Sequence, residues 1–461
     1  MAHTVQNKSQ PNLLEGPLFG KIVLFVLPLI LTNLLQRLYN AADMIIVGMS
    51  GVDGALGAIG TTGAMINLVL NLFMGLAAGT NVVVARWIGA GDRAETERAV
   101  HTSLVVSVIF GVACGILGLL ISRPLLIFLG DEGHILELAV LYCYIYFAGV
   151  PFVAVMNFAI CIFRAKGDTK TPMYILSASG VLNVVLNLVF VVFCRMHVDG
   201  VAWATVISNA IAAAVLVWML LKEDSWCRVT PRKLKLHKNS FGEILRIGVP
   251  SGLQSMMFSL SNMVIQSSVI TVNSMHCPGG SAVIDGIAAA DNLETFIYTA
   301  QNSVHHGAVT FTSQHYGAGK IKRIRKVMVN CTIVAVMISL LFGLFIKLLQ
   351  KPLLGLYISD SMAMQEAMVR HGVTLFAYAF CSLMEVVTGV LRGMGRSAIC
   401  AIVTFFGVCI FRVAWNLLVF PLWPTMTCIF LSYPISWLLT TAICFFICMH
   451  TLKKEQQKHT T

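Results

Sequence analysis

Residues 28–48 read PLILTNLLQRLYNAADMIIVG and give the clearest indication of the fold class. It is apolar and long enough to cross the roughly 30 Å hydrocarbon core of a bilayer as a helix of about 20 residues. It nevertheless contains a carboxylate, Asp43, which costs about 2.5–3.5 kcal/mol in a membrane helix and by default marks a functional site. The polar residues Asn33, Gln36, Asn40 and Asp43 recur at helical spacing. We therefore predict a transmembrane helix with one polar face.

The composition extends this interpretation to the whole chain of 461 residues. Hydrophobic residues make up 57% and charged residues 11%, and the mean hydropathy is +0.81. These values exclude a soluble globular protein of ordinary composition. The apolar runs are near the length of a membrane helix, whereas a membrane barrel needs alternating strands of about 10 residues. We expect an all-α integral membrane protein, and we interpret the net charge of +11 as a topology signal rather than as a nucleic-acid surface.

Hydrophobic spans predict twelve transmembrane helices. An even number places both termini on one side, and most Lys and Arg residues fall in loops on that side, which predicts cytoplasmic termini. Arg370 is assigned to a loop on the opposite side. The spans lie at about 22–49, 55–85, 97–121, 134–163, 171–195, 198–222, 243–274, 283–315, 324–348, 363–391, 397–420 and 424–450.

Two pairs of loops match each other at a single offset along the chain. WIGAGDRAETERAV at 87–100 matches HYGAGKIKRIRKVM at 315–328, and FRAKGDTK at 163–170 matches LRGMGRSA at 391–398. Near the same offset, Pro28 corresponds to Pro250 and Asn40 to Asn262. The matches predict an internal duplication.

The duplication predicts two six-helix lobes. We place the N-lobe at 1–221, a charged cytoplasmic linker at 222–242 and the C-lobe at 243–461. Each repeat returns to its starting side, so the lobes have parallel topology, related by a pseudo-twofold axis along the membrane normal. Such a pair can open a central cleft first to one side and then to the other, which favours a transporter.

With its GAGD turn at 89–92, RAKGD at 164–168 and LRGMG at 391–395, the chain resembles the prokaryotic multidrug and toxic compound extrusion (MATE) transporters over essentially its whole length. The resemblance implies a multi-pass protein of the bacterial cytoplasmic (inner) membrane, which we expect to be a monomer. It further implies export of small amphipathic, often cationic or aromatic compounds by alternating access. The driving force would be a proton or sodium gradient.

The resemblance also implies an ion-coupling cluster in the N-lobe. The family commonly has Asp at position 187, where this chain has Asn187, so Asp43 is the only carboxylate of the cluster. Asn183 and Asn187 share one face of their helix. The expected members are Gln36, Tyr39, Asp43, Asn157, Asn183, Asn187 and Thr205.

The sequence leaves the coupling ion open. Burial favours the protonated form of Asp43, which suits a proton site. The hard oxygen ligands of Asp43, Asn183 and Asn187 suit sodium equally. An internal salt bridge of Asp43 with Arg37 or another buried base is the structural alternative to an ion site.

In the C-lobe we expect coupling or substrate contacts at Glu385, the one acid in the apolar part of its span. At two other positions where one branch of the family has an acidic residue, this chain has Phe258 and Cys381. A structural pairing of Glu385 with Arg412 is the alternative. Further polar candidates in C-lobe spans are Gln254, Asn262, Gln266 and Arg412.

Two polar pairs on the eighth span have simpler explanations. The adjacent His305 and His306 point about 100° apart on a helix and are not expected to share one ion. Asp291 and Glu294 fit interior hydrogen bonding about as well as a cleft lining.

Two other classes of function were weighed. A flippase for lipid-linked oligosaccharides or lipids would need a more basic cavity than Arg37 and Arg412 provide. An enzyme would need a catalytic motif such as HExxH or GxSxG at membrane depth, and an ATP-driven pump a Walker A sequence. The sequence contains none of these, so we expect no enzyme activity and no cofactor beyond the coupling ion.

Overall fold

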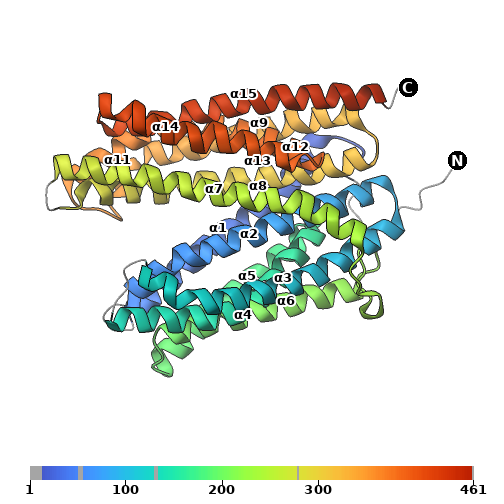
Figure 1. The fold of residues 1–461 in the computed structure, drawn as a ribbon, viewed down its shortest axis with the longest axis horizontal. Coiled ribbons are helices and arrows are strands. Elements are labelled where there is room, and N and C mark those ends of the chain that lie inside the picture. The colour runs from blue at the N-terminus through green and yellow to red at the C-terminus, as the bar shows by residue number, and fades with distance from the viewer. Residues whose placement is uncertain (1–12, 50–54, 129–132, 278–279, 459–461) are drawn as a thin grey trace. The chain divides into compact units, whose positions relative to one another are not determined.

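The computed structural model describes residues 13–49, 55–128, 133–277 and 280–458, and within these ranges the chain is helical without a β-strand (Figure 1). The prediction of an all-α fold is confirmed. The α-helices are α1 (Leu18–Met49), α2 (Ala55–Ala90), α3 (Arg93–Phe128), α4 (Gly133–Ala165), α5 (Lys170–Asn187), α6 (Val198–Lys222), α7 (Lys238–His276), α8 (Ala282–Gly317), α9 (Ile321–Leu348), α10 (Gln350–Leu354), α11 (Ser361–Thr374), α12 (Tyr378–Gly393), α13 (Ser397–Thr404), α14 (Phe411–Leu418) and α15 (Met426–Lys458).

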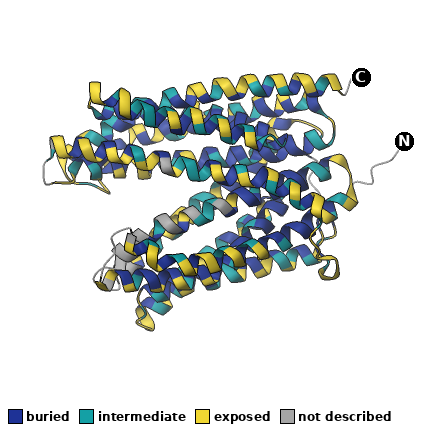
Figure 2. Ribbon diagram, in the orientation of Figure 1, coloured by how far each residue is buried: buried dark blue, intermediate teal, exposed yellow. Residues whose placement is uncertain are grey.

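Most of these helices are long and apolar enough to cross a membrane. Within the described ranges ten qualify singly, and α11 with α12 forms an eleventh span. α8 is as long as α2 but is not among them, since its buried face is polar and includes Glu294, Gln301 and His305. With α8, the helices correspond to the twelve predicted spans. Exposed residues recur along the helices (Figure 2). They include large apolar side chains such as Phe193 and Phe446, as expected of helices that contact lipid.

Three predicted spans depart from a single regular α-helix. The span at 363–391 is broken between α11 and α12, which are bent by 49° directly after Thr374. π-helical turns at Leu188–Phe193 and Phe405–Ile410 extend α5 and join α13 to α14. Hydropathy does not reveal such breaks, because it indicates how apolar a span is and not which backbone hydrogen bonds form within it. π-turns inside helices are frequently found at functional sites.

The described chain divides into two compact units. Unit 1 comprises residues 27–252 together with the start of the chain, and unit 2 comprises 15–26 and 253–461. α1 and α7 each contribute to both units, and the divisions fall close to the corresponding prolines, Pro28 and Pro250. A proline inside a helix removes one backbone hydrogen bond, which makes it a natural place for a helix to change its packing partners.

In unit 1, α4 packs against α2, α3 and α6, and α5 packs against α6. Phe73, Phe147 and Leu126 lie fully buried in its apolar core. The segment between α6 and α7 is also part of this unit. Its Glu223 accepts a hydrogen bond from Lys166 (2.6 Å), and burial raises the pKa of the Cys227 thiol to about 12. The connection that follows α6 is therefore packed against the helices of unit 1.

Glycines bring α2 against the first part of α7 within unit 1. A Cβ at Gly75 would lie 2.2 Å from the Gly252 nitrogen, and one at Gly79 would lie 2.5 Å from the Ile244 carbonyl oxygen. The two backbones can approach this closely only because the side chains are absent. The contact fixes α2 against α7.

Gly75→Ala is expected to destabilise the protein by about 1–3 kcal/mol, because the backbones must move apart. Thermal unfolding of purified protein in detergent measures the change. Gly63→Ala on the same helix is the matched control, since a Cβ there meets no atom within 4 Å. It is expected to be neutral or to stabilise by about 0.5–1 kcal/mol. Equal melting temperatures for the two variants would contradict the packing argument.

In unit 2, α8 packs against α9, α11 and α12, and α12 packs against α15. Leu293, Ile297 and Trp437 belong to the apolar core of this unit. A Cβ at Gly286 would lie 2.2 Å from the Ala363 carbonyl oxygen, which places α8 and α11 in close contact. α8 is the central helix of the unit, and its neighbours enclose Glu294, Gln301 and His305.

Candidate functional site

Unit 1 holds a polar cluster around Asp43. The Asn187 amide donates to the Asp43 carboxylate at 2.5 Å and lies 3.3 Å from Asn183 Oδ1. The Asn183 amide in turn donates to Thr205 Oγ1 at 3.4 Å. Side chains from α1, α5 and α6 thus form one connected chain of polar groups. The structure brings together four of the residues expected from the sequence.

Asp43 is half-buried, and the structure shows no ion pair between it and Arg37, which is exposed. The salt-bridge alternative for Asp43 is therefore wrong. The carboxylate instead accepts a hydrogen bond from the neutral side-chain amide of Asn187, which is buried. The Oδ1 atom of Asn187 has no hydrogen-bond partner among the described residues. Among the described residues, this buried carbonyl oxygen has no donor and the neighbouring carboxylate has no ion-pair partner, an arrangement that suits a small positive ion.

The remaining expected members of the N-lobe cluster take other partners. Tyr39 donates to the Ser177 carbonyl oxygen at 3.2 Å, and its ring occupies the space beside Gly180. The Asn157 amide donates to the Val153 carbonyl oxygen on its own helix at 2.8 Å. Gln36 is exposed. Within the part of the chain that the structure describes, none of these side chains is hydrogen-bonded to Asp43, although Tyr39 joins α1 to α5.

Unit 2 holds a second polar chain, built around Glu385. The carboxylate lies 3.0 Å from His305 Nδ1, and Arg392 donates to His305 Nε2 at 3.1 Å. Arg392 also donates to Gln254 Oε1 at 2.9 Å, and the Gln254 amide donates to Thr404 Oγ1 at 3.1 Å. Two residues expected from the sequence, Glu385 and Gln254, therefore belong to one buried network.

Arg412 is not the partner of Glu385. Its guanidinium lies 4.0 Å from the centre of the Tyr433 ring and donates to Ser436 Oγ at 3.1 Å. The pairing of Glu385 with Arg412 is therefore wrong, and Glu385 pairs with a histidine instead. Asn262 and Gln266 are exposed on α7, outside this network.

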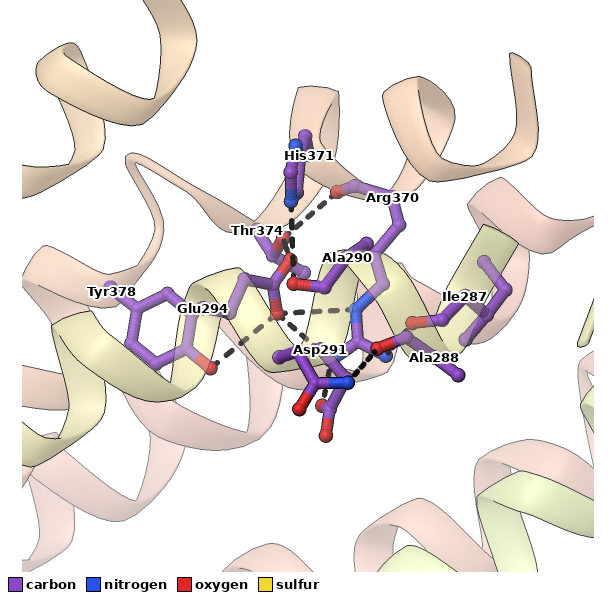
Figure 3. Close-up of polar contacts among 10 residues, drawn as sticks. Ile287, Ala288, Ala290, Asp291, Glu294, Arg370, His371, Thr374 and Tyr378 are labelled. Carbon is purple, nitrogen blue, oxygen red and sulfur yellow. Dashed lines mark hydrogen bonds and ion pairs between the residues drawn. The ribbon is translucent and has the colours of Figure 1, made fainter. Parts of the chain in front are cut away.

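A third polar cluster was assigned wrongly from the sequence. Arg370 is 5% exposed within α11 rather than in a loop. It donates to Glu294 Oε2 through Nε (3.1 Å) and Nη2 (2.9 Å), and also to Asp291 (Figure 3). Thr374 and Tyr378 donate to the same glutamate. The prediction that Arg370 lies in a loop is wrong because the sequence of one span does not show which acid on another helix pairs with a buried arginine.

The Arg370 cluster joins three elements of unit 2. Glu294 and Asp291 come from α8, Arg370 and Thr374 from α11, and Tyr378 from α12. Every polar group of Glu294 is engaged, which suits a structural role. The interior hydrogen bonding considered for this pair is what the structure shows for Glu294, whereas the Asp291 side chain is 64% exposed and reaches Arg370 from the surface. Among the described residues, no group of three or more His, Cys, Asp or Glu side chains is placed to hold a metal ion.

Comparison with known proteins gives matches along most of the chain. The sequence profile of the MatE family matches residues 28–189 and 250–418, and the two matched segments begin at the corresponding prolines. A probable multidrug resistance protein, YpnP of Bacillus subtilis, is 27% identical over 383 residues, which is 83% of this chain and 84% of that protein. The multidrug export protein MepA of Staphylococcus aureus is 23% identical over 83% of this chain and 84% of its own length. An FAD transporter of Shewanella oneidensis is 21% identical over 78% of both.

Solved structures agree on the fold. A crystal structure of a MATE protein in complex with MaL6 has a TM-score of 0.90 and 23% identity, and the match covers 98% of this chain and all of that one. An outward-facing multidrug resistance MATE transporter also matches with a TM-score of 0.90, over 98% of this chain and 100% of that chain. The prediction of a MATE-like fold is confirmed.

Proposed function

The chain belongs to the MatE family of multidrug transporters, and from this membership we propose that it is a secondary active exporter that expels amphipathic, often cationic or aromatic compounds by alternating access. The energy would come from inward flow of protons or sodium ions. We place it as a monomer in the bacterial cytoplasmic membrane, with both termini in the cytoplasm.

The observation that carries the proposal is the single carboxylate of the polar cluster formed by Asp43, Asn183, Asn187 and Thr205 in unit 1. Asp43 is bonded to the Asn187 amide, and Asn187 Oδ1 has no donor among the residues that the structure describes. A bound proton or sodium ion would neutralise the charge of Asp43 and change the strength of its hydrogen bond with the Asn187 amide. Asn187 is the last residue of α5 before the π-helical turn, so its contacts bear on the shape of that helix.

Ion binding can drive export only if the ion and the drug prefer different conformations. We propose that ion binding at Asp43 favours one conformation and drug binding the other. Asn183 and Thr205 extend the polar chain from Asp43 through α5 to α6, so a change at the carboxylate has a path into neighbouring helices. The same oxygens would provide ligands for sodium.

The direct test uses the purified protein in liposomes loaded with ethidium. Ethidium efflux is expected when a proton or a sodium gradient is imposed, and the ion that supports it identifies the coupling ion. Efflux should stop when an ionophore collapses that gradient. FAD, the substrate named for one relative, belongs in the panel. Efflux at the rate of protein-free liposomes under both gradients, for every compound, would contradict the proposed export.

A lipid flippase is not favoured, but the same liposomes test it. A fluorescent phospholipid is expected to cross no faster with the protein than without it. Accelerated lipid crossing without any dye efflux would reverse the assignment.

A further inference from the structure

His305 lies between two opposite charges inside unit 2. It is 3% exposed on α8, with Glu385 at one ring nitrogen and Arg392 at the other. Glu385 and Arg392 are two turns apart on the same face of α12. A Cβ at Gly389, which lies between them, would sit 3.2 Å from His305 Nδ1. The absence of a side chain at Gly389 leaves the space that the ring occupies.

The hydrogen-bond partners fix the form of the ring. A guanidinium group only donates hydrogen bonds, so Nε2 must accept from Arg392 and holds no proton. Nδ1 must then hold the proton of a neutral imidazole and donate it to Glu385, either to the carboxylate at 3.0 Å or to the main-chain oxygen at 2.8 Å. The structure therefore holds a neutral histidine between an anion and a cation.

Only one position on this ring can take a further proton, and it faces Arg392. Proton transfer from a hydronium ion would break its O–H bond, form an N–H bond at Nε2 and leave a water molecule, and the hydrogen bond from Arg392 to Nε2 would be lost. The resulting imidazolium is stabilised by Glu385 and repelled by Arg392. Arg392 must then move, and it also bonds Gln254 of α7. Protonation would therefore alter how the end of α12 is held against α7 and α8.

The titratable and charged groups near the ring, as far as the described residues show them, come from α8, α12 and α13. On α8 itself the neighbouring His306 ring lies 5.7 Å away, centre to centre. On α12 the groups are Glu385 and Arg392, and on α13 the Cys400 thiol interacts electrostatically with both of them. From α7, the uncharged Gln254 contacts Arg392. Glu385 and Arg392 are thus the charges that decide between the two forms of His305.

We propose that His305 is a proton-binding site of unit 2 that is loaded and emptied during transport, with Arg392 bound to the neutral ring and displaced from the protonated one. The site is separate from Asp43, and the proposal rests on the proposed ion-driven export. A single proton at Nε2 changes the net charge of the group formed by Glu385, His305 and Arg392.

The first test observes the ring itself. Full-length protein labelled with ¹⁵N-histidine is reconstituted in lipid bilayers for solid-state NMR, and the His305 signals are assigned by their absence in His305→Gln. At about pH 8 an unprotonated Nε2 and a protonated Nδ1 are expected, and at about pH 5 both nitrogens should be protonated. A ring with a protonated Nε2 at the higher pH, or one that stays neutral throughout, would overturn the proposal.

The second test measures the protons moved per dye molecule, from the membrane and pH gradients at which ethidium flux reverses. His305→Gln keeps an amide donor for Glu385 and an oxygen acceptor for Arg392 but binds no proton. It is expected to move about one proton fewer per dye than the wild type, with an unchanged melting temperature that shows intact folding. His306→Gln, one position along α8, is the matched control and should keep the wild-type ratio.

The possible outcomes separate this inference from the proposed function. An unchanged proton ratio in His305→Gln would overturn the role of His305 and leave ion-driven export standing. Export driven by a sodium gradient alone would likewise overturn the role of His305 and leave ion-driven export standing. Absence of any gradient-driven dye flux in the wild type would overturn the proposed function itself.

Discussion

Asp43→Asn is expected to abolish ion-driven dye efflux, reducing it to the rate of protein-free liposomes. Asparagine has the shape of aspartate and can still form a hydrogen bond with Asn187, so the substitution removes little except the negative charge. Asp43 is the only carboxylate in the polar chain of unit 1 that includes Asn183, Asn187 and Thr205. Without it, neither a proton nor a sodium ion has an anion to bind in this cluster.

Two controls sharpen the Asp43 experiment. Gln36→Ala changes an exposed residue of the same helix and should leave efflux unchanged. The double variant Asp43→Asn with Asn187→Asp returns one carboxylate to the cluster, on α5 instead of α1. It is expected to recover part of the efflux, because the two side chains are in direct contact. Wild-type efflux by Asp43→Asn alone would show that the coupling charge lies elsewhere.

Arg370→Met is expected to produce the largest loss of stability, about 3–5 kcal/mol, because it leaves Glu294 buried without its cation. Glu294 is 1% exposed, and Arg370 reaches it through two nitrogens. Thermal unfolding in detergent measures the loss. The effect should appear as lower stability rather than as a changed ion preference, since the cluster is fully engaged in joining α8, α11 and α12 (Figure 3).

An exposed ion pair supplies the matched comparison for Arg370. Arg123 and Glu137 are 2.7 Å apart, with both side chains more than half exposed. Arg123→Met is expected to cost no more than about 1 kcal/mol. Adding Glu294→Gln to Arg370→Met removes the stranded charge and should restore part of the stability. Equal losses for Arg370→Met and Arg123→Met would show that burial does not govern the strength of these pairs.

Much of the fold was predictable because its signals are local or repeated. Helices of membrane length follow from runs of apolar residues, and the duplication follows from matching turns. The two segments that match the family begin at Pro28 and Pro250, the pair that the internal alignment had placed together. The grouping of Asn183 with Asn187 was also local, since residues four apart share a helix face.

Contacts between helices were predicted less well. Arg370 was placed in a loop, and Glu385 was given Arg412 as its alternative partner. Both errors concern charges whose partners lie on other helices. Hydropathy and spacing fix which face a side chain occupies on its own helix, but not which helix packs against that face. His305 illustrates the same limit, because its role depends on α12 and on the space beside Gly389.

The membrane-spanning length of the helix at 28–48, its polar face and the place of Asp43 as the one acid of its lobe's expected cluster could all be predicted from residue types and their spacing. The hydrogen bond between Asp43 and Asn187, and the contact between Glu385 and His305, became known from the packed structure. The physical reason is that the strength of a buried polar contact depends on separations of a few ångströms between side chains from different helices, and those separations are set by packing.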